Sequence, residues 1–338
     1  MTPRELVYQT LEFRNESGRV PRQIWTLPWT FEHFPREWET ISRRFPDDIV
    51  NCPNLLKKPA PTKGDPFVVG QYVDEWGCVF ENKQKGIIGE VKAPMITDED
   101  WEGADQIRAP EELLDLDVEA INRFCAGTDQ FVNAITSARI FERLQFFAGT
   151  EKTLMDLLLQ PDGMLETLER THEFFCKELE AWGKTDVDAL VMQDDWGSQR
   201  ALLINPKLWE QLFKPCYADY AAIAHKHGKK FFLHSDGYIL DIIPHLIDIG
   251  VDALNSQIFC IGVDKLEQFR GKITFWGEID RQYLLTRGTA DEVREAVRKV
   301  HRLLWQNGGC IGQVDFGPGT NPDNLAAALE QWEQYGRD

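Results

Sequence analysis

The second half of the chain alternates short apolar runs with amphipathic helical patterns, and this alternation constrains the fold most. Residues 189–192 form a continuous apolar run, as expected for a parallel strand buried on both faces. A helix is predicted from Asn205-Pro206 to Gly228. Further strands are predicted at 230–234, 251–255, 272–277 and 310–314, with a helix at 290–306 before the last. Strands that alternate with helices in this way predict a parallel sheet.

The first half is less regular. Residues 20–26, 48–52 and 131–136 predict three strands, and 161–183 predict a long helix. Residues 67–96 alternate apolar and polar side chains with glycines, which predicts an antiparallel excursion. Thr2, Pro3 and Glu5 predict a capped N-terminal helix rather than a signal peptide. We therefore expect a (β/α)8 TIM barrel with an N-terminal helical extension, in a single domain over residues 1–338; an open doubly wound sheet is the alternative.

Charge and cysteine usage narrow the range of partners. The formal net charge is −18 at pH 7, and such a surface repels phosphate backbones and anionic lipids. No run of about 18 apolar residues is present, so neither a nucleic acid nor a membrane is expected as a partner. The 7 cysteines contain no C-x-x-C pair, which is typical of reduced, mostly buried thiols in a cytoplasmic protein. A homodimer is the default expectation, because symmetric pairs are the commonest assembly.

Polar side chains follow five successive predicted strands. These strand ends carry Asp194-Asp195, His234-Ser235-Asp236, Asn255-Ser256-Gln257, Gly277-Glu278 and Asp315. In a parallel barrel the carboxyl ends of the strands converge on one mouth, where TIM-barrel enzymes place their active sites. The sequence therefore predicts an enzyme that acts on a small molecule. No G-x-G-x-x-G after a strand, P-loop or G-x-S-x-G elbow is present to indicate a nucleotide or serine-hydrolase site.

Each of these residues has a structural alternative. His234 and Asp236 are suited to bind a divalent ion, but Asp236 also fits a turn that caps the next helix. Adjacent carboxylates at Asp194 and Asp195 raise one pKa and suit proton transfer, although alternation along a strand points only one into the mouth. Glu278 and Asp315 are equally suited to supporting positions. In the excursion, Trp76 either covers a substrate or anchors the excursion on the barrel.

The strand ends resemble those of the uroporphyrinogen decarboxylase superfamily. The resemblance rests on runs that begin at Asp74, Asp194, His234, Gly250, Gly277 and Pro322: Asp-Glu-Trp-Gly, Asp-Asp-Trp-Gly-Ser-Gln, His-Ser-Asp-Gly, Gly-Val-Asp-Ala-Leu-Asn, Gly-Glu-Ile-Asp and Pro-Asp-Asn. It covers almost the whole chain and implies a (β/α)8 barrel. The arginine-rich signature of true decarboxylases has no counterpart in residues 25–31, and their late histidine has none near Asp315. Decarboxylation of a porphyrinogen with eight carboxylates is therefore not expected.

The cobalamin-dependent methyltransferase branch resembles this chain better. Those enzymes bind zinc through a His-x-Cys pair and a later cysteine, and the zinc activates a substrate thiol for attack on a methylated corrinoid. His234 matches the first ligand, whereas Asp236 stands in place of the first cysteine. Asp315 lies near the place of the second, and Cys310 lies earlier in that strand. Carboxylates make the site harder, which favours a different acceptor, a different metal, or no metal.

The resemblance therefore implies a methyltransferase in a corrinoid-dependent methyl-transfer or demethylation system. Its expected cofactors are zinc or another divalent metal and a corrinoid (cobalamin) carried by a partner protein. The expected metal ligands are His234, Asp236 and Asp315; the expected catalytic residues are Asp194, Asp195, His234 and Glu278; the expected substrate-binding residues are Trp25, Trp76, Asn255 and Gln257. A metal-assisted decarboxylase or lyase acting on a small carboxylate, and a non-catalytic corrinoid- or ligand-binding barrel, are the alternatives.

Overall fold

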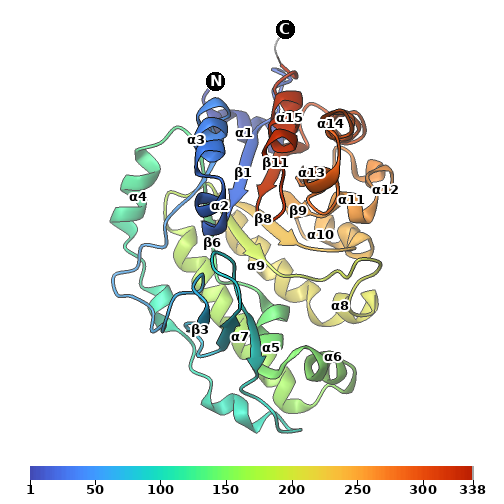
Figure 1. The fold of residues 1–338 in the computed structure, drawn as a ribbon. Coiled ribbons are helices and arrows are strands. Elements are labelled where there is room, and N and C mark those ends of the chain that lie inside the picture. Colours follow the sequence, from blue (N-terminus) through green and yellow to red (C-terminus); the bar gives the residue numbers. More distant parts are fainter. Residues whose placement is uncertain (337–338) are drawn as a thin grey trace.

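Eight parallel strands form the main sheet of the computed structural model, which describes residues 1–336 (Figure 1). The strands are β1 (Arg22–Thr26), β2 (Ile49–Asn51), β6 (Phe131–Ile135), β7 (Ala189–Gln193), β8 (Lys230–Ser235), β9 (Ala253–Ser256), β10 (Thr274–Trp276) and β11 (Cys310–Phe316). Their order is β1-β11-β10-β9-β8-β7-β6-β2, so each strand lies beside its neighbour in the chain. The N–H of Asp48 donates to the carbonyl of Arg22 at 2.9 Å and joins β2 to β1. The predicted (β/α)8 barrel is confirmed.

The helices follow the strands in the predicted alternation. They are α1 (Pro3–Leu11), α2 (Pro28–His33), α3 (Pro35–Arg44), α4 (Val118–Ala126), α5 (Ile140–Ala148), α6 (Thr150–Leu159), α7 (Asp162–Gly183), α8 (Pro206–Leu212), α9 (Lys214–Lys226), α10 (Ile243–Asp248), α11 (Ile258–Ile261), α12 (Val263–Leu266), α13 (Leu284–Arg287), α14 (Ala290–Leu304) and α15 (Pro322–Trp332), with 3₁₀ turns η1 (Glu102–Gln106), η2 (Glu111–Leu114), η3 (Leu240–Ile242) and η4 (Glu267–Phe269). The prediction of one helix from Asn205 to Gly228 is wrong. Pro215 has no N–H to donate to the preceding turn, so the chain breaks at Phe213 and restarts as α9.

Apolar side chains fill the interior of the barrel. Inward-facing residues of the strands, among them Phe131, Phe232 and Trp276, form one cluster with Val7 and Leu11 of α1. The predicted capping box of Thr2 and Glu5 begins this helix. α1 is hydrogen-bonded to segments that precede strands. The N–H of Arg4 donates to the carbonyl of Asp129 at 2.9 Å, and the N–H of Gly309 donates to the carbonyl of Thr10 at 3.1 Å. It therefore closes the amino-terminal end of the barrel and leaves the carboxyl-terminal end as the mouth.

The predicted excursion is a separate antiparallel sheet of β3 (Gly70–Val73), β4 (Val79–Asn82) and β5 (Glu90–Ala93), drawn below the barrel beside α5 and α7 in Figure 1. Its anchor is Arg143 of α5, whose buried guanidinium lies 2.5 Å from Asp74 and 3.5 Å from Glu75. At its other side, the N–H of Trp29 in α2 donates to the carbonyl of Gly86. A Cβ on Gly86 would lie 2.6 Å from the Trp29 backbone, so only glycine allows this close approach. The sheet thus spans from α5 to α2.

Two further expectations concern the cysteines and the membrane. Cys52, Cys78, Cys125, Cys216 and Cys310 are buried free thiols, whereas Cys176 and Cys260 are partly exposed. Within residues 1–336, no helix combines the length and hydropathy needed to span a bilayer. Cytoplasmic location and the assignment of residues 1–338 to one domain stay predictions.

Candidate active site

His234, at the end of β8, is held in one orientation by Asn255 of β9. Its Nδ1 lies 2.6 Å from the Asn255 Oδ1. The Asn255 amide nitrogen donates to the carbonyl of Trp276, so the network assigns the amide oxygen to the histidine. Nδ1 therefore donates to Asn255, and Nε2 faces the mouth.

Two carboxylates face this Nε2. The Asp195 Oδ1 lies 3.6 Å from it and the Asp236 Oδ1 lies 3.8 Å from it. Asp195 is fixed because its Oδ1 also accepts the N–H of Asp236 at 2.8 Å. The Asp236 Oδ1 is buried and has no hydrogen-bond partner.

One ligand atom from each of Asp195, His234 and Asp236 lies within 4.8 Å of the other two. A neutral imidazole nitrogen beside two carboxylate oxygens is a donor set that suits a divalent ion. The Asn255 contact to His234 is the supporting hydrogen bond that metal-bound histidines usually make. The group therefore fits a metal, with Asp195 as a further possible ligand beside the predicted His234 and Asp236.

Arg281, a residue that the sequence analysis missed, holds the acids on the other side of Asp236. Its guanidinium contacts the Asp236 Oδ2 and lies 3.4 Å from Glu278 and 3.3 Å from Asp315. Burial raises the pKa of Glu278 well above its usual value, and burial also raises the pKa of Asp315. Arg281 directly follows the Gly-Glu-Ile-Asp run after β10, and this position beside a predicted strand end could have identified it as a site residue. Asp315 has Arg281 as its partner in this structure, and its role as a metal ligand stays a prediction.

Asp194 lies behind the mouth and caps α5. It is fully buried, and its carboxylate accepts the N–H groups of Phe141 and Glu142 and the hydroxyl of Tyr217, at 2.8–2.9 Å. A carboxylate at this place satisfies orphan N–H groups and the positive end of the helix dipole. Burial raises the pKa of Asp194 to about 6. As alternation along the strand predicts, Asp195 faces the mouth and Asp194 is buried behind it; a catalytic role for Asp194 stays a prediction.

A cavity of about 720 Å³ opens beside His234. Its lining combines polar and apolar residues: Gln23, Gln193, His234, Arg281 and Asp315 are among the polar ones, and Trp25, Leu27, Phe67, Ile88 and Ile135 among the apolar ones. The Trp25 ring lies 5.4 Å from the His234 ring, between centroids. Gln193 was missed although it immediately precedes Asp194, and alternation places it on the inward face.

The other predicted substrate-binding residues lie elsewhere. Trp76 is 5% exposed and packs against Phe147, Phe174 and Phe175, so it anchors the excursion instead of covering a substrate. Gln257 and Glu278 line a separate hollow of about 10 Å³. Asn255 is buried and acts on the mouth through His234.

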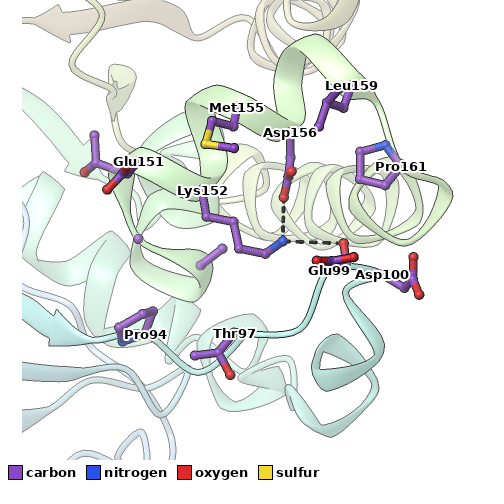
Figure 2. Close-up of a pocket in the computed structure, with 13 residues that line it drawn as sticks. Pro94, Thr97, Glu99, Asp100, Glu151, Lys152, Met155, Asp156, Leu159 and Pro161 are labelled. Carbon is purple, nitrogen blue, oxygen red and sulfur yellow. Dashed lines mark hydrogen bonds and ion pairs between the residues drawn. The ribbon is translucent and has the colours of Figure 1, made fainter.

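A larger cavity of about 830 Å³ lies outside the barrel, between α6 and residues 94–100. Figure 2 shows Lys152 extended between Asp156, at 2.7 Å, and the backbone of Glu99, at 3.5 Å. None of the residues predicted for the site lines this cavity, and its only lysine is already paired. The predicted site residues are therefore at the strand ends, where His234 and Asp315 line the smaller cavity.

Comparisons with known proteins place this architecture in a family. Residues 73–335 match the model of the family described as uroporphyrinogen decarboxylase (URO-D). The chain belongs to the uroporphyrinogen decarboxylase family. No protein of curated function matches the sequence.

Solved structures extend the similarity beyond the range matched by the uroporphyrinogen decarboxylase family. A methyltransferase from Methanosarcina mazei is 13% identical and covers 99% of each chain, with a TM-score of 0.72. A B12-independent methionine synthase from Shewanella sp. W3-18-1 is also 13% identical; the match covers 64% of this chain and 66% of that one, with a TM-score of 0.45. The first of these similarities confirms the fold over nearly the whole chain.

Proposed function

We propose that this protein is a methyltransferase of the uroporphyrinogen decarboxylase family that acts in a corrinoid-dependent methyl-transfer or demethylation system. The observation that carries the proposal is the His234 Nε2 presented to Asp195 and Asp236 at the barrel mouth. The fold shared with the Methanosarcina mazei methyltransferase supports it. The absence of arginine from residues 25–31 weighs against a porphyrinogen with eight carboxylates, for which true decarboxylases need cations.

The metal in this proposal is zinc or another divalent ion held by Asp195, His234 and Asp236. Such an ion would stabilise the electron pair left on a heteroatom when its methyl group departs. Asn255 keeps the His234 tautomer that a metal ligand requires, and the N–H of Asp236 holds Asp195 in place. Two carboxylates make this donor set harder than one with two thiolates, so an oxygen or nitrogen substrate suits it better than a thiol.

The lining of the cavity describes the substrate. Trp25, Leu27 and Ile135 offer apolar surface for its body, and polar residues such as His234 would contact the end that carries the methyl group. A cavity of about 720 Å³ is large enough for a small molecule of this kind. The corrinoid, carried by a partner protein, would approach through the open mouth. A homodimer stays a prediction.

Anaerobic methyl transfer tests the proposal. The purified protein, loaded with Zn²⁺, is incubated with reduced cobalamin and a panel of methoxylated and methylamine substrates, and methylcobalamin is followed spectroscopically. We expect transfer from at least one substrate, and a loss of at least about 100-fold in H234A. H172A is the matched control, because His172 lies on α7 and pairs with Asp219.

Two other outcomes of these experiments would favour the alternative functions. Release of carbon dioxide from small carboxylates without cobalamin would replace the proposal with a decarboxylase or lyase. Tight cobalamin binding that H234A leaves unchanged, with no transfer from any substrate, would indicate a non-catalytic binding barrel.

A further inference from the structure

Arg281 lies among three acids that come from three different strand ends. Asp236 follows β8, Glu278 follows β10 and Asp315 is the penultimate residue of β11. The guanidinium contacts all three, and its side chain is 27% exposed. The ionised carboxylates among these three acids share a single positive charge, so this corner of the mouth favours a cation.

Asp236 joins this corner to the candidate metal group. Its Oδ2 contacts Arg281, whereas its Oδ1 faces the His234 Nε2 at 3.8 Å and has no hydrogen-bond partner. One carboxylate therefore faces two adjacent cation positions. Enzymes with two metal ions commonly hold the pair about 3.5–4 Å apart at such clustered carboxylates.

We propose that the Arg281 guanidinium occupies the second cation position of the mouth and so limits the centre to a single divalent ion. The inference rests on the proposed metal group of Asp195, His234 and Asp236. Glu278 and Asp315 then serve to position Arg281 rather than to bind a metal. Arginine suits this task because it stays protonated and offers several donors in a rigid plane.

The charge balance gives the consequence of removing Arg281. In R281M, Asp236, Glu278 and Asp315 lose their shared partner and repel one another. A divalent ion that enters the vacated space relieves this repulsion, with Glu278 and Asp315 as new ligands. In R281K the ammonium preserves a fixed positive charge, so no second ion is required.

The test measures Mn²⁺ binding to the whole protein by calorimetry and by elemental analysis after desalting. We expect one ion per chain in the wild type and R281K, and two in R281M. Spin coupling in the Mn²⁺ resonance spectrum should show that the two ions are neighbours. The double variant R281M/D315N should return to one ion. At Mn²⁺ about 100-fold above its Kd, the Tm of R281M should rise about 4 °C beyond any rise in R281K.

The outcomes separate this inference from the proposed function. One ion in both the wild type and R281M overturns the role of Arg281 and leaves the proposed metal group intact. If the wild type binds no ion and R281M binds one, the result supports Arg281 as the cation of this corner. The proposed function would then lose its metal. If R281M stays unfolded even when produced with Mn²⁺, whereas R281K folds, the inference is also overturned, because the ion has failed to replace the guanidinium.

Discussion

Replacement of Asn255 by leucine removes the hydrogen bond that orients His234 and leaves the imidazole itself in place. Asn255 is 1% exposed, accepts from the His234 Nδ1 at 2.6 Å and donates to the carbonyl of Trp276. Leucine has a similar volume but can make neither bond. In N255L the imidazole loses the partner that fixes its tautomer, and the Trp276 carbonyl loses its donor.

Each lost contact has an expected magnitude. Removing a supporting hydrogen bond from a metal-bound histidine lowers affinity by about 10–100-fold, or about 1.4–2.7 kcal/mol. A buried carbonyl without a donor costs about 1–3 kcal/mol of folding free energy. N255L should therefore weaken Zn²⁺ binding and also reduce the stability of the metal-free protein.

Calorimetry with a competing chelator measures the affinity for Zn²⁺, and urea unfolding of the metal-free protein measures stability. The matched control is N324L on α15, because Asn324 is 4% exposed and also donates to two carbonyls, those of Leu284 and Gly288. We expect N324L to lose similar stability and to keep its Zn²⁺ affinity. Affinity in N255L within twofold of the wild type would refute the reasoning.

Three other predictions concern stability, measured by urea unfolding. T289A removes the capping box of Thr289 and Glu292 and should cost about 1 kcal/mol; no loss would contradict a role for this cap in α14. F232A empties the centre of the barrel, where Phe232 lies 5.1 Å from the Trp276 ring between centroids, and should cost about 3–5 kcal/mol; a loss below about 1 kcal/mol would contradict this packing. Burial raises the pKa of Glu178 to about 7 from an ordinary 4.5, so the folded state binds more protons between these values and loses stability as pH rises through about 7. E178Q should therefore gain up to about 3 kcal/mol relative to the wild type between pH 5 and pH 8, and an equal difference at both pH values would contradict it.

Periodicity predicted the alternation of strands and helices, and the family resemblance implied that the sheet closes into a barrel. Continuous apolar runs such as residues 189–192 can be buried only in a sheet covered on both faces, and these runs coincide with β7 to β11. The break at Phe213 was not predicted, because the apolar pattern continues through Pro215 and hides the missing N–H.

The site was predicted in part, because strand order brings distant residues together but does not choose their partners. His234, Asp195 and Asp236 follow from their places at strand ends and from alternation. Arg281 reaches Asp315 across 34 positions of sequence, a pairing that local pattern does not contain. For the same reason, local pattern did not predict that Asp195 lies beside His234 and Asp236.

Crystallography at the zinc absorption edge tests the central claim most directly. Crystals of the wild-type protein purified without chelators and supplied with Zn²⁺ would be measured, together with crystals of H234A. The account predicts one anomalous peak per chain within bonding distance of Asp195, His234 and Asp236, and no peak at that place in H234A. An absent peak, or one that persists beside the two aspartates in H234A, would contradict a metal centre built on His234.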